Sequence, residues 1–117
     1  MDQQNQQYNI GGINYTADDI VNKGIVELMG LMDLPEEKKD KIRQAAQDTI
    51  QGRALARVFD NLDENEQQKF KQLLEQSDDT KIEEYLKTKN IDMGKITIEE
   101  TLLYKLQMVN TAKAARS

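Results

Sequence analysis

Apolar residues recur at three- and four-residue steps along most of the chain after Tyr15. This spacing is typical of amphipathic helices, because it places the apolar side chains on one face. The chain has few glycines, a single proline and abundant Gln, Glu, Lys, Leu and Ala, which also favours helix over sheet. We therefore predict an all-α protein, a small bundle of four to five helices with short connections.

The first helix is expected to begin after Thr16 and to end near Asp33. Thr16 is followed three residues later by Asp19, a spacing typical of a capping box, in which side chains satisfy the first free backbone N–H groups. The apolar positions of this segment are Ile20, Ile25, Leu28, Met29 and Met32.

The second helix is expected from Pro35 to Asn61. Proline suits the start of a helix, because the N–H that it lacks would have no partner there. The apolar residues before Gly52 lie on a different side of the helix from those after it. The sequence leaves two interpretations open: a straight helix with different partners for its two halves, or a helix that bends at Gly52.

Three further helices are expected, beginning near Asp63, Thr80 and Thr97. Asp63 and Glu66 repeat the capping-box spacing, and so do Thr97 and Glu100. The segment between the last two helices, IDMGKI, is expected to be a loop.

The chain is expected to form a single domain of the usual size for its 117 residues. Residues 1–15 are rich in Gln, Asn and Gly and offer little to bury, so we predict a flexible N-terminal tail there. Residues 16–112 then form the helical domain, and residues 113–117 a frayed C-terminal tail. A compact chain of this length has a radius of gyration of about 13 Å.

The composition excludes several kinds of chemistry. The chain contains no Cys and no His, so it has no disulfide, no thiolate and no histidine, the usual base of a nucleophilic triad. Zinc sites favour those same two residue types. Most acidic doublets lie at expected helix starts, where negative charge is favourable. We therefore expect no enzymatic activity, no cofactor and no metal.

The charge balance favours a soluble acidic protein. The formal net charge is −5, and 32% of the residues are charged. Nucleic-acid binders usually carry a basic excess, so this balance argues against dedicated nucleic-acid binding. No apolar run approaches the ~20 residues of a membrane span, and the N-terminus lacks the features of a signal peptide. We expect a cytoplasmic protein with no membrane association.

The strongest candidate for a partner surface surrounds Gly30. Thioether side chains repack easily, so methionines here could form an adaptable binding surface. The alternative is a corner in which the glycine allows close approach and the methionines fill the core. Apolar area that one small core cannot absorb would form an interface. The leading hypothesis is a non-enzymatic protein–protein interaction or self-associating module, such as a homodimer, with a surface formed by Met29, Leu31, Met32 and Leu34.

The alternative hypothesis is a nucleic-acid-associated protein. Four cationic residues of the second helix fall within a narrow angular sector, and the C-terminal region is mildly basic. Such a stripe could face phosphates, and binding would then weaken steeply with salt. The same side chains could instead flank a packed face and extend outward into solvent. The residues are Lys39, Arg43, Arg53 and Arg57.

Three segments, ELMGLMDLPEEKKDKI, ARVFDNLDENEQQKFKQLLEQ and IEEYLK, lie between Ile25 and Leu86. They resemble a family of short acidic helical proteins, a domain of unknown function found in small-genome bacteria of the candidate phyla radiation. That family similarly has an apolar segment ending in Leu-Pro-Glu-Glu, a long helix, and a Glu-rich helix with a Phe-Leu-Leu-type stripe. It brings no assigned activity or functional residues, so the resemblance implies an all-helical fold and nothing more.

Overall fold

The computed structural model describes residues 6–116 of the chain, and these are mostly helical. The helical class is therefore confirmed, although a small two-stranded sheet precedes the helices. The elements within these residues are β1 (Gln7–Ile10), β2 (Ile13–Thr16), α1 (Ala17–Asn22), α2 (Ile25–Leu28), α3 (Glu36–Asp60), α4 (Glu64–Gln76), α5 (Asp79–Thr88) and α6 (Met93–Arg116).

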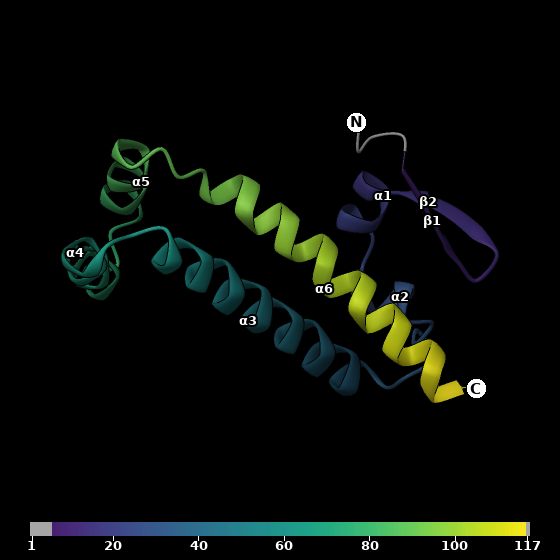
Figure 1. Ribbon diagram of the computed structural model, residues 1–117. Coiled ribbons are helices and arrows are strands. Elements are labelled where there is room, and N and C mark those ends of the chain that lie inside the picture. The colour runs from purple at the N-terminus through teal and green to yellow at the C-terminus, as the bar shows by residue number, and fades with distance from the viewer. Residues whose placement is uncertain (1–5, 117) are drawn as a thin grey trace.

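Two long helices, α3 and α6, run antiparallel and side by side along the molecule (Figure 1). The shorter elements gather at the two ends of this pair. The α4 and α5 helices lie at one end, while the hairpin, α1 and α2 lie at the other. The arrangement is a helix pair with two capped ends, which differs from the predicted bundle of four to five helices.

Most of the buried apolar residues form two separate clusters, one near each end of the α3–α6 pair. The α4–α5 cluster contains Ala54, Val58, Leu62, Phe70, Leu86 and Ile96. The α2 cluster contains Ile25, Val26, Met29, Ala46 and Tyr104. Only α3 and α6 contribute buried residues to both.

Because the core is divided, the molecule is elongated and thin. The radius of gyration is 16.9 Å, well above the value of about 13 Å expected for a compact chain of this length. The principal dimensions are 48 × 40 × 22 Å. The shortest dimension equals about two helix diameters, since a helix with its side chains is roughly 10–12 Å wide.

Two of the predicted capping boxes are present. Thr16 Oγ1 accepts from the Asp19 N–H at 3.1 Å, and Asp19 Oδ2 accepts from the Thr16 N–H at 3.0 Å. Asp63 and Glu66 make the same reciprocal pair at the start of α4. Each box satisfies two backbone N–H groups that a helix start leaves without a partner.

The first predicted helix is wrong in its extent. The chain leaves α1 after Asn22, passes through extended backbone at Lys23 and Gly24, and re-enters a single helical turn, α2. The α2 turn closes at Gly30, whose φ of 71° is left-handed. The Leu31 N–H then bonds to the Val26 carbonyl at 3.0 Å, which completes a Schellman motif.

The α3 helix runs without interruption through Gly52, from Glu36 to Asp60. The helix is therefore continuous at Gly52, and its two halves have different partners, as the first interpretation expects. The first half of α3 contributes Ala46 to the α2 cluster, and the second half contributes Ala54 and Val58 to the α4–α5 cluster. The change of apolar face along this helix reflects its two sets of partners.

The predicted start of the last helix at Thr97 is wrong, because α6 begins one turn earlier at Met93. Asp92 Oδ1 accepts from the Lys95 N–H at 3.1 Å and so occupies the capping position. Thr97 lies inside the helix, where its hydroxyl donates to the Met93 carbonyl at 2.8 Å. Asn90, at a φ of 57°, closes α5 in the left-handed region.

The predicted N-terminal tail is structured from Gln7 onward, whereas residues 1–5 lie outside the described part of the chain. The sequence YNIGGINY reads the same in both directions over residues 8–15, and the strands pair like with like: Tyr8 opposes Tyr15, Asn9 opposes Asn14, and Ile10 opposes Ile13. Gly11 and Gly12, at φ values of 59° and 83°, form the two-residue turn.

The C-terminal end also differs from expectation. Where the sequence predicts a frayed tail from residue 113, α6 continues as far as Arg116, and Ser117 lies outside the described residues. The helix keeps one apolar side in this region, since Met108 and Ala112 pack against the α2 cluster.

Opposite effects are expected from two glycine-to-alanine substitutions. Gly30→Ala should lower the free energy of unfolding by about 1–2 kcal/mol, because a β-carbon is unfavourable in the left-handed conformation. Gly52→Ala should raise it by about 0.5–1 kcal/mol, because a helical alanine loses less conformational entropy. A β-carbon at Gly52 meets no atom within 4 Å. Urea denaturation measures both, and an unchanged stability of Gly30→Ala would contradict the left-handed turn.

Acid sensitivity is expected from Glu66, which accepts hydrogen bonds from Lys89 on one side and from the Asp63 N–H on the other. The hydrogen bond from Lys89 is the main cause that holds the pKa of the Glu66 carboxyl below 4.5. The ionised form therefore stabilises the fold above pH 4.5, and this contribution is lost as the pH falls through the lowered pKa.

Urea midpoints measured from about pH 7 to about pH 3 should thus fall less steeply for Glu66→Gln than for the unaltered chain. Glu75→Gln, at an exposed position of the same helix, is the matched control and should keep the original slope. Equal slopes for the two variants would show that the Glu66 pairing does not form in solution.

Candidate interaction surface

The four residues predicted as one partner surface around Gly30 lie in different environments. Met29 is buried at 8% exposure inside the α2 cluster, and Leu31 packs against that cluster. Met32 is 48% exposed, while Leu34 is half-buried. The turn at Gly30 separates the two methionines, so that one faces the core and the other faces solvent. Met29 thus belongs to the core, and only part of the predicted surface is accessible to a partner.

The four cations of the predicted stripe all contact other groups of the protein. Lys39 is buried, and its Nζ lies 2.7 Å from a Glu36 carboxylate oxygen and 3.2 Å from the Met32 carbonyl. Arg43 pairs with Asp40 at 2.8 Å. Both cations therefore bind groups in the first turns of α3, and Lys39 also binds the segment that precedes this helix.

The other two cations connect α3 to α6. Arg57 donates to Glu99 at 3.0 Å and to Glu100 at 3.1 Å, and Glu100 is itself buried at 8% exposure. The Glu99 hydrogen bond is the main cause that raises the pKa of Arg57. Arg53 donates to Gln107 at 2.9 Å and lies over the Tyr104 ring.

Each of the four cations already has a partner within the protein, which leaves it less available to a phosphate group. The nucleic-acid hypothesis stays a prediction, and the pairing of the four side chains counts against it. Their observed role is structural, because they hold the start of α3 and join the two long helices.

A groove of about 520 Å³ lies between the middle of α3 and the first half of α6. On α3, its residues fall between Ala46 of one cluster and Ala54 of the other. The groove therefore marks the stretch of the helix pair that lies between the two clusters. Its lining contains no carboxylate and consists of Gln47, Ile50, Gln51, Met93, Thr97, Thr101 and Lys105.

Lys105, at one end of this groove, holds α1 in place. Its Nζ donates to the carbonyls of Val21 and Lys23, both at 2.7 Å. These carbonyls lie at the C-terminal end of α1, where a positive charge is favourable. Burial lowers the pKa of the Lys105 amine. The chain thus uses this lysine to join α1 to α6, across more than eighty positions of sequence.

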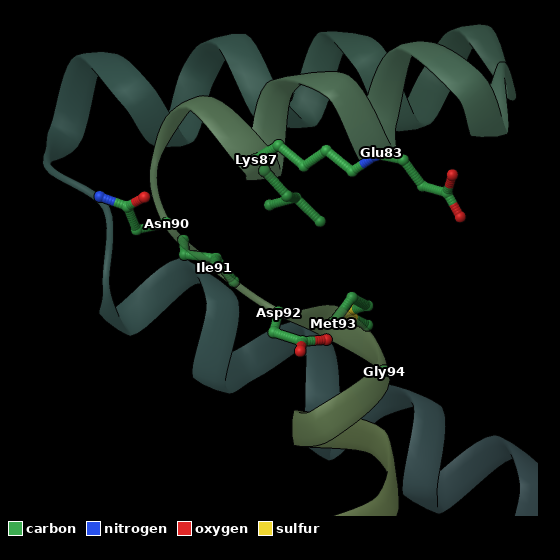
Figure 2. Close-up of a pocket in the computed structure, with 8 residues that line it drawn as sticks. Glu83, Lys87, Asn90, Ile91, Asp92, Met93 and Gly94 are labelled. Carbon is green, nitrogen blue, oxygen red and sulfur yellow. The ribbon is translucent and has the colours of Figure 1, made fainter.

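A second cavity, of about 620 Å³, lies where α5 leads into α6. Figure 2 shows Glu83 and Lys87 extending from α5, with Asp92 and Met93 across from them at the start of α6. The Asp92 carboxylate is already used as the cap of α6. Among the described residues, no buried side-chain nitrogen or oxygen lacks a hydrogen-bond partner.

A third cavity, of about 470 Å³, is formed by the hairpin, the turn at Gly30 and the end of α6. Its lining combines hairpin backbone with Met29, Val109 and Lys113. Over residues 6–116, no cluster of three or more Asp, Glu, His or Cys side chains is arranged to hold a metal ion. None of the described helices combines the length and apolar character that crossing a membrane requires.

Large apolar side chains are exposed at several places on the described surface. Two of them, Ile98 at 54% and Leu103 at 56%, lie on α6. Ile13 of the hairpin is exposed at 57%. These residues, together with Met32, supply the accessible apolar surface that the sequence located only near Met32.

Comparisons with protein-family models, with curated proteins and with solved structures found no match for this chain. The resemblance to the small-genome bacterial family stays a prediction. The function of the chain has to be argued from its own surface.

The groove between α3 and α6 is a site that the sequence does not predict. Its polar members, Gln47, Gln51, Thr97 and Thr101, look like ordinary helix-surface residues in the sequence. A partial signal exists in the i, i+4 spacing of the two glutamines and of the two threonines, which places each pair on one helix face. The pattern alone does not show that these two faces adjoin.

Proposed function

We propose that this protein is a non-enzymatic self-associating module that functions as a homodimer. The observation that carries the proposal is the large surface of the single chain. It exposes 8324 Å² for a mass of 13.5 kDa. A folded monomer of that mass exposes about 6500 Å².

The excess is more than twice the area that a dimer interface of standard size removes from each partner. It amounts to roughly 1800 Å², whereas a stable interface of standard size buries about 800 Å² on each partner. One such interface would bring the exposed area per chain closer to that of an ordinary folded protein. The thin shape of the molecule has the same origin, since a 22 Å slab has little interior.

The composition of the surface supports a protein partner. Ile98 is more than half exposed, and it lies on α6, one of the two helices that span the molecule. Single exposed apolar residues are normal on monomers, but here they accompany a large excess of surface.

A non-enzymatic role is supported by how the ionisable groups are used. Asp19, Asp63 and Asp92 accept hydrogen bonds from backbone N–H groups at helix starts. Glu99 and Glu100 pair with Arg57. These carboxylates serve the fold. The cavity between α5 and α6 is lined by two carboxylates, Glu83 and Asp92, and Asp92 already caps α6.

Light scattering coupled to size-exclusion chromatography, repeated over a hundredfold range of concentration, tests the proposal. A mass of twice 13.5 kDa that falls toward 13.5 kDa on dilution is the expected result. A mass of 13.5 kDa at every concentration would overturn it.

A further inference from the structure

We infer that two copies of this chain associate face to face through the groove between α3 and α6, so that the two helix pairs form a four-helix arrangement. This inference rests on the proposed self-association and names the surface that carries it. The occupant of the groove is the same face of a second copy, which makes the interface symmetric.

The charge of the groove favours this face. Each copy carries a formal net charge of −5, so two copies repel unless they meet where acidic side chains are absent. The groove lining contains no carboxylate, and its apolar members are Ile50, Met93 and the methyl groups of Thr97 and Thr101. Gln47 and Gln51 form an exposed, neutral rim.

The opposite side of the α3–α6 pair is less suitable. At about 100° per residue, Thr97, Thr101 and Lys105 lie roughly on the other side of α6 from Glu99, Leu103 and Gln107. On that other side, Arg57 and Arg53 already bridge α3 to α6 through Glu99 and Gln107. A partner there would have to cover charged pairs, which costs desolvation energy.

The shape of the molecule favours the same arrangement. Figure 1 shows α3 and α6 side by side, and the molecule is only 22 Å across its shortest dimension. Stacking two copies across that dimension doubles the 22 Å thickness to about 44 Å, beside lengths of 48 and 40 Å. The pair would then have nearly equal dimensions, as a compact particle does.

A two-fold axis close to Thr101 avoids contact between like charges. The two α6 helices then run antiparallel, so that Lys105 of one copy lies opposite Thr97 of the other. The Lys105 amine also keeps its own partners, the carbonyls of Val21 and Lys23. The groove can thus close on itself without burying two facing lysines.

The test places negative charge at the rim of the groove. The variant Gln47→Glu with Gln51→Glu keeps side-chain size and changes two exposed positions one helical turn apart. The matched control, Gln68→Glu with Gln72→Glu, makes the same change with the same spacing at exposed positions of α4. The dimer dissociation constant of each full-length variant is measured by sedimentation velocity, with circular dichroism as the check on folding.

The expected result is a dissociation constant at least tenfold higher for the groove variant and within about twofold of the unaltered chain for the α4 control. If the groove variant loses helicity, Gln51→Arg takes its place with the same expected weakening. Equal dimerisation of the groove variant and the control would overturn this inference and leave self-association standing. A monomeric unaltered chain would overturn both.

Discussion

Replacing Phe70 with alanine is expected to lower the free energy of unfolding by about 3–5 kcal/mol. Phe70 is fully buried and stands at the centre of the α4–α5 cluster. Its ring meets Phe59 edge-on, with centroids 5.2 Å apart, and lies near-parallel to Tyr85 at 6.3 Å. Alanine would remove both ring contacts and leave a cavity that α4 and α5 can only partly close.

This loss is a large part of the total stability, because small domains are stable by only about 5–15 kcal/mol. Urea denaturation at one fixed protein concentration measures it, since dimerisation would make stability depend on concentration. Leu103→Ala, at a position 56% exposed, is the control and should change stability by no more than about 0.5 kcal/mol. A loss below about 1 kcal/mol for Phe70→Ala would show that the α4–α5 end is not packed in solution.

The two methionines beside Gly30 are expected to respond very differently to alanine. Met29→Ala should cost about 2–5 kcal/mol, because this side chain is 8% exposed and packs in the α2 cluster. Met32→Ala should change stability by at most about 0.5 kcal/mol, because Met32 is 48% exposed. The backbone carbonyl of Met32, which accepts from Lys39, is kept in either variant.

Thermal and urea unfolding of the two single variants, made in the same chain, measure this difference. Each variant serves as the control for the other, since both lose the same atoms three positions apart. Equal losses would mean that the turn at Gly30 does not separate the two side chains. A large loss of stability for Met32→Ala, with no loss for Met29→Ala, would show that Met32 and not Met29 packs in the core.

Much of the local structure can be predicted from the sequence, because short-range chemistry determines it. The capping spacing at Asp63 and Glu66 locates the start of α4 within one residue. Pro35 marks the start of α3 in the same way. Asn90 ends α5 in the left-handed conformation for which asparagine has an unusual tolerance. Each of these signals depends on residues within one or two turns of each other.

The errors arise where two local signals compete. Thr97 and Glu100 have good capping spacing, but Asp92 offers a competing cap one turn earlier and the helix begins there. A helix from Thr16 to Asp33 fits the apolar pattern, yet Gly24 permits a break that separates α1 from α2. The hairpin was predicted as a tail because its composition is polar, although Gly11 and Gly12 between two isoleucines are a recognised hairpin signal.

The candidate site is harder to predict than the elements. The groove exists only because α3 and α6, which are distant in sequence, lie side by side between the two clusters. The partners of Arg57 lie more than forty positions away, so the sequence shows a cation stripe and not the ion pairs that occupy it. Long-range packing decides which polar residues stay available to a partner.

The divided core has a consequence for the order of folding. The α4–α5 cluster joins residues close in sequence, such as Phe70 and Leu86. Its loops are therefore short, and closing them costs little conformational entropy. The α2 cluster joins Met29 to Tyr104, and Lys105 reaches back to Val21, so that end requires nearly the whole chain. During synthesis, the α4–α5 end can therefore assemble first, and the N-terminal elements must wait for α6 to be completed before they find their place.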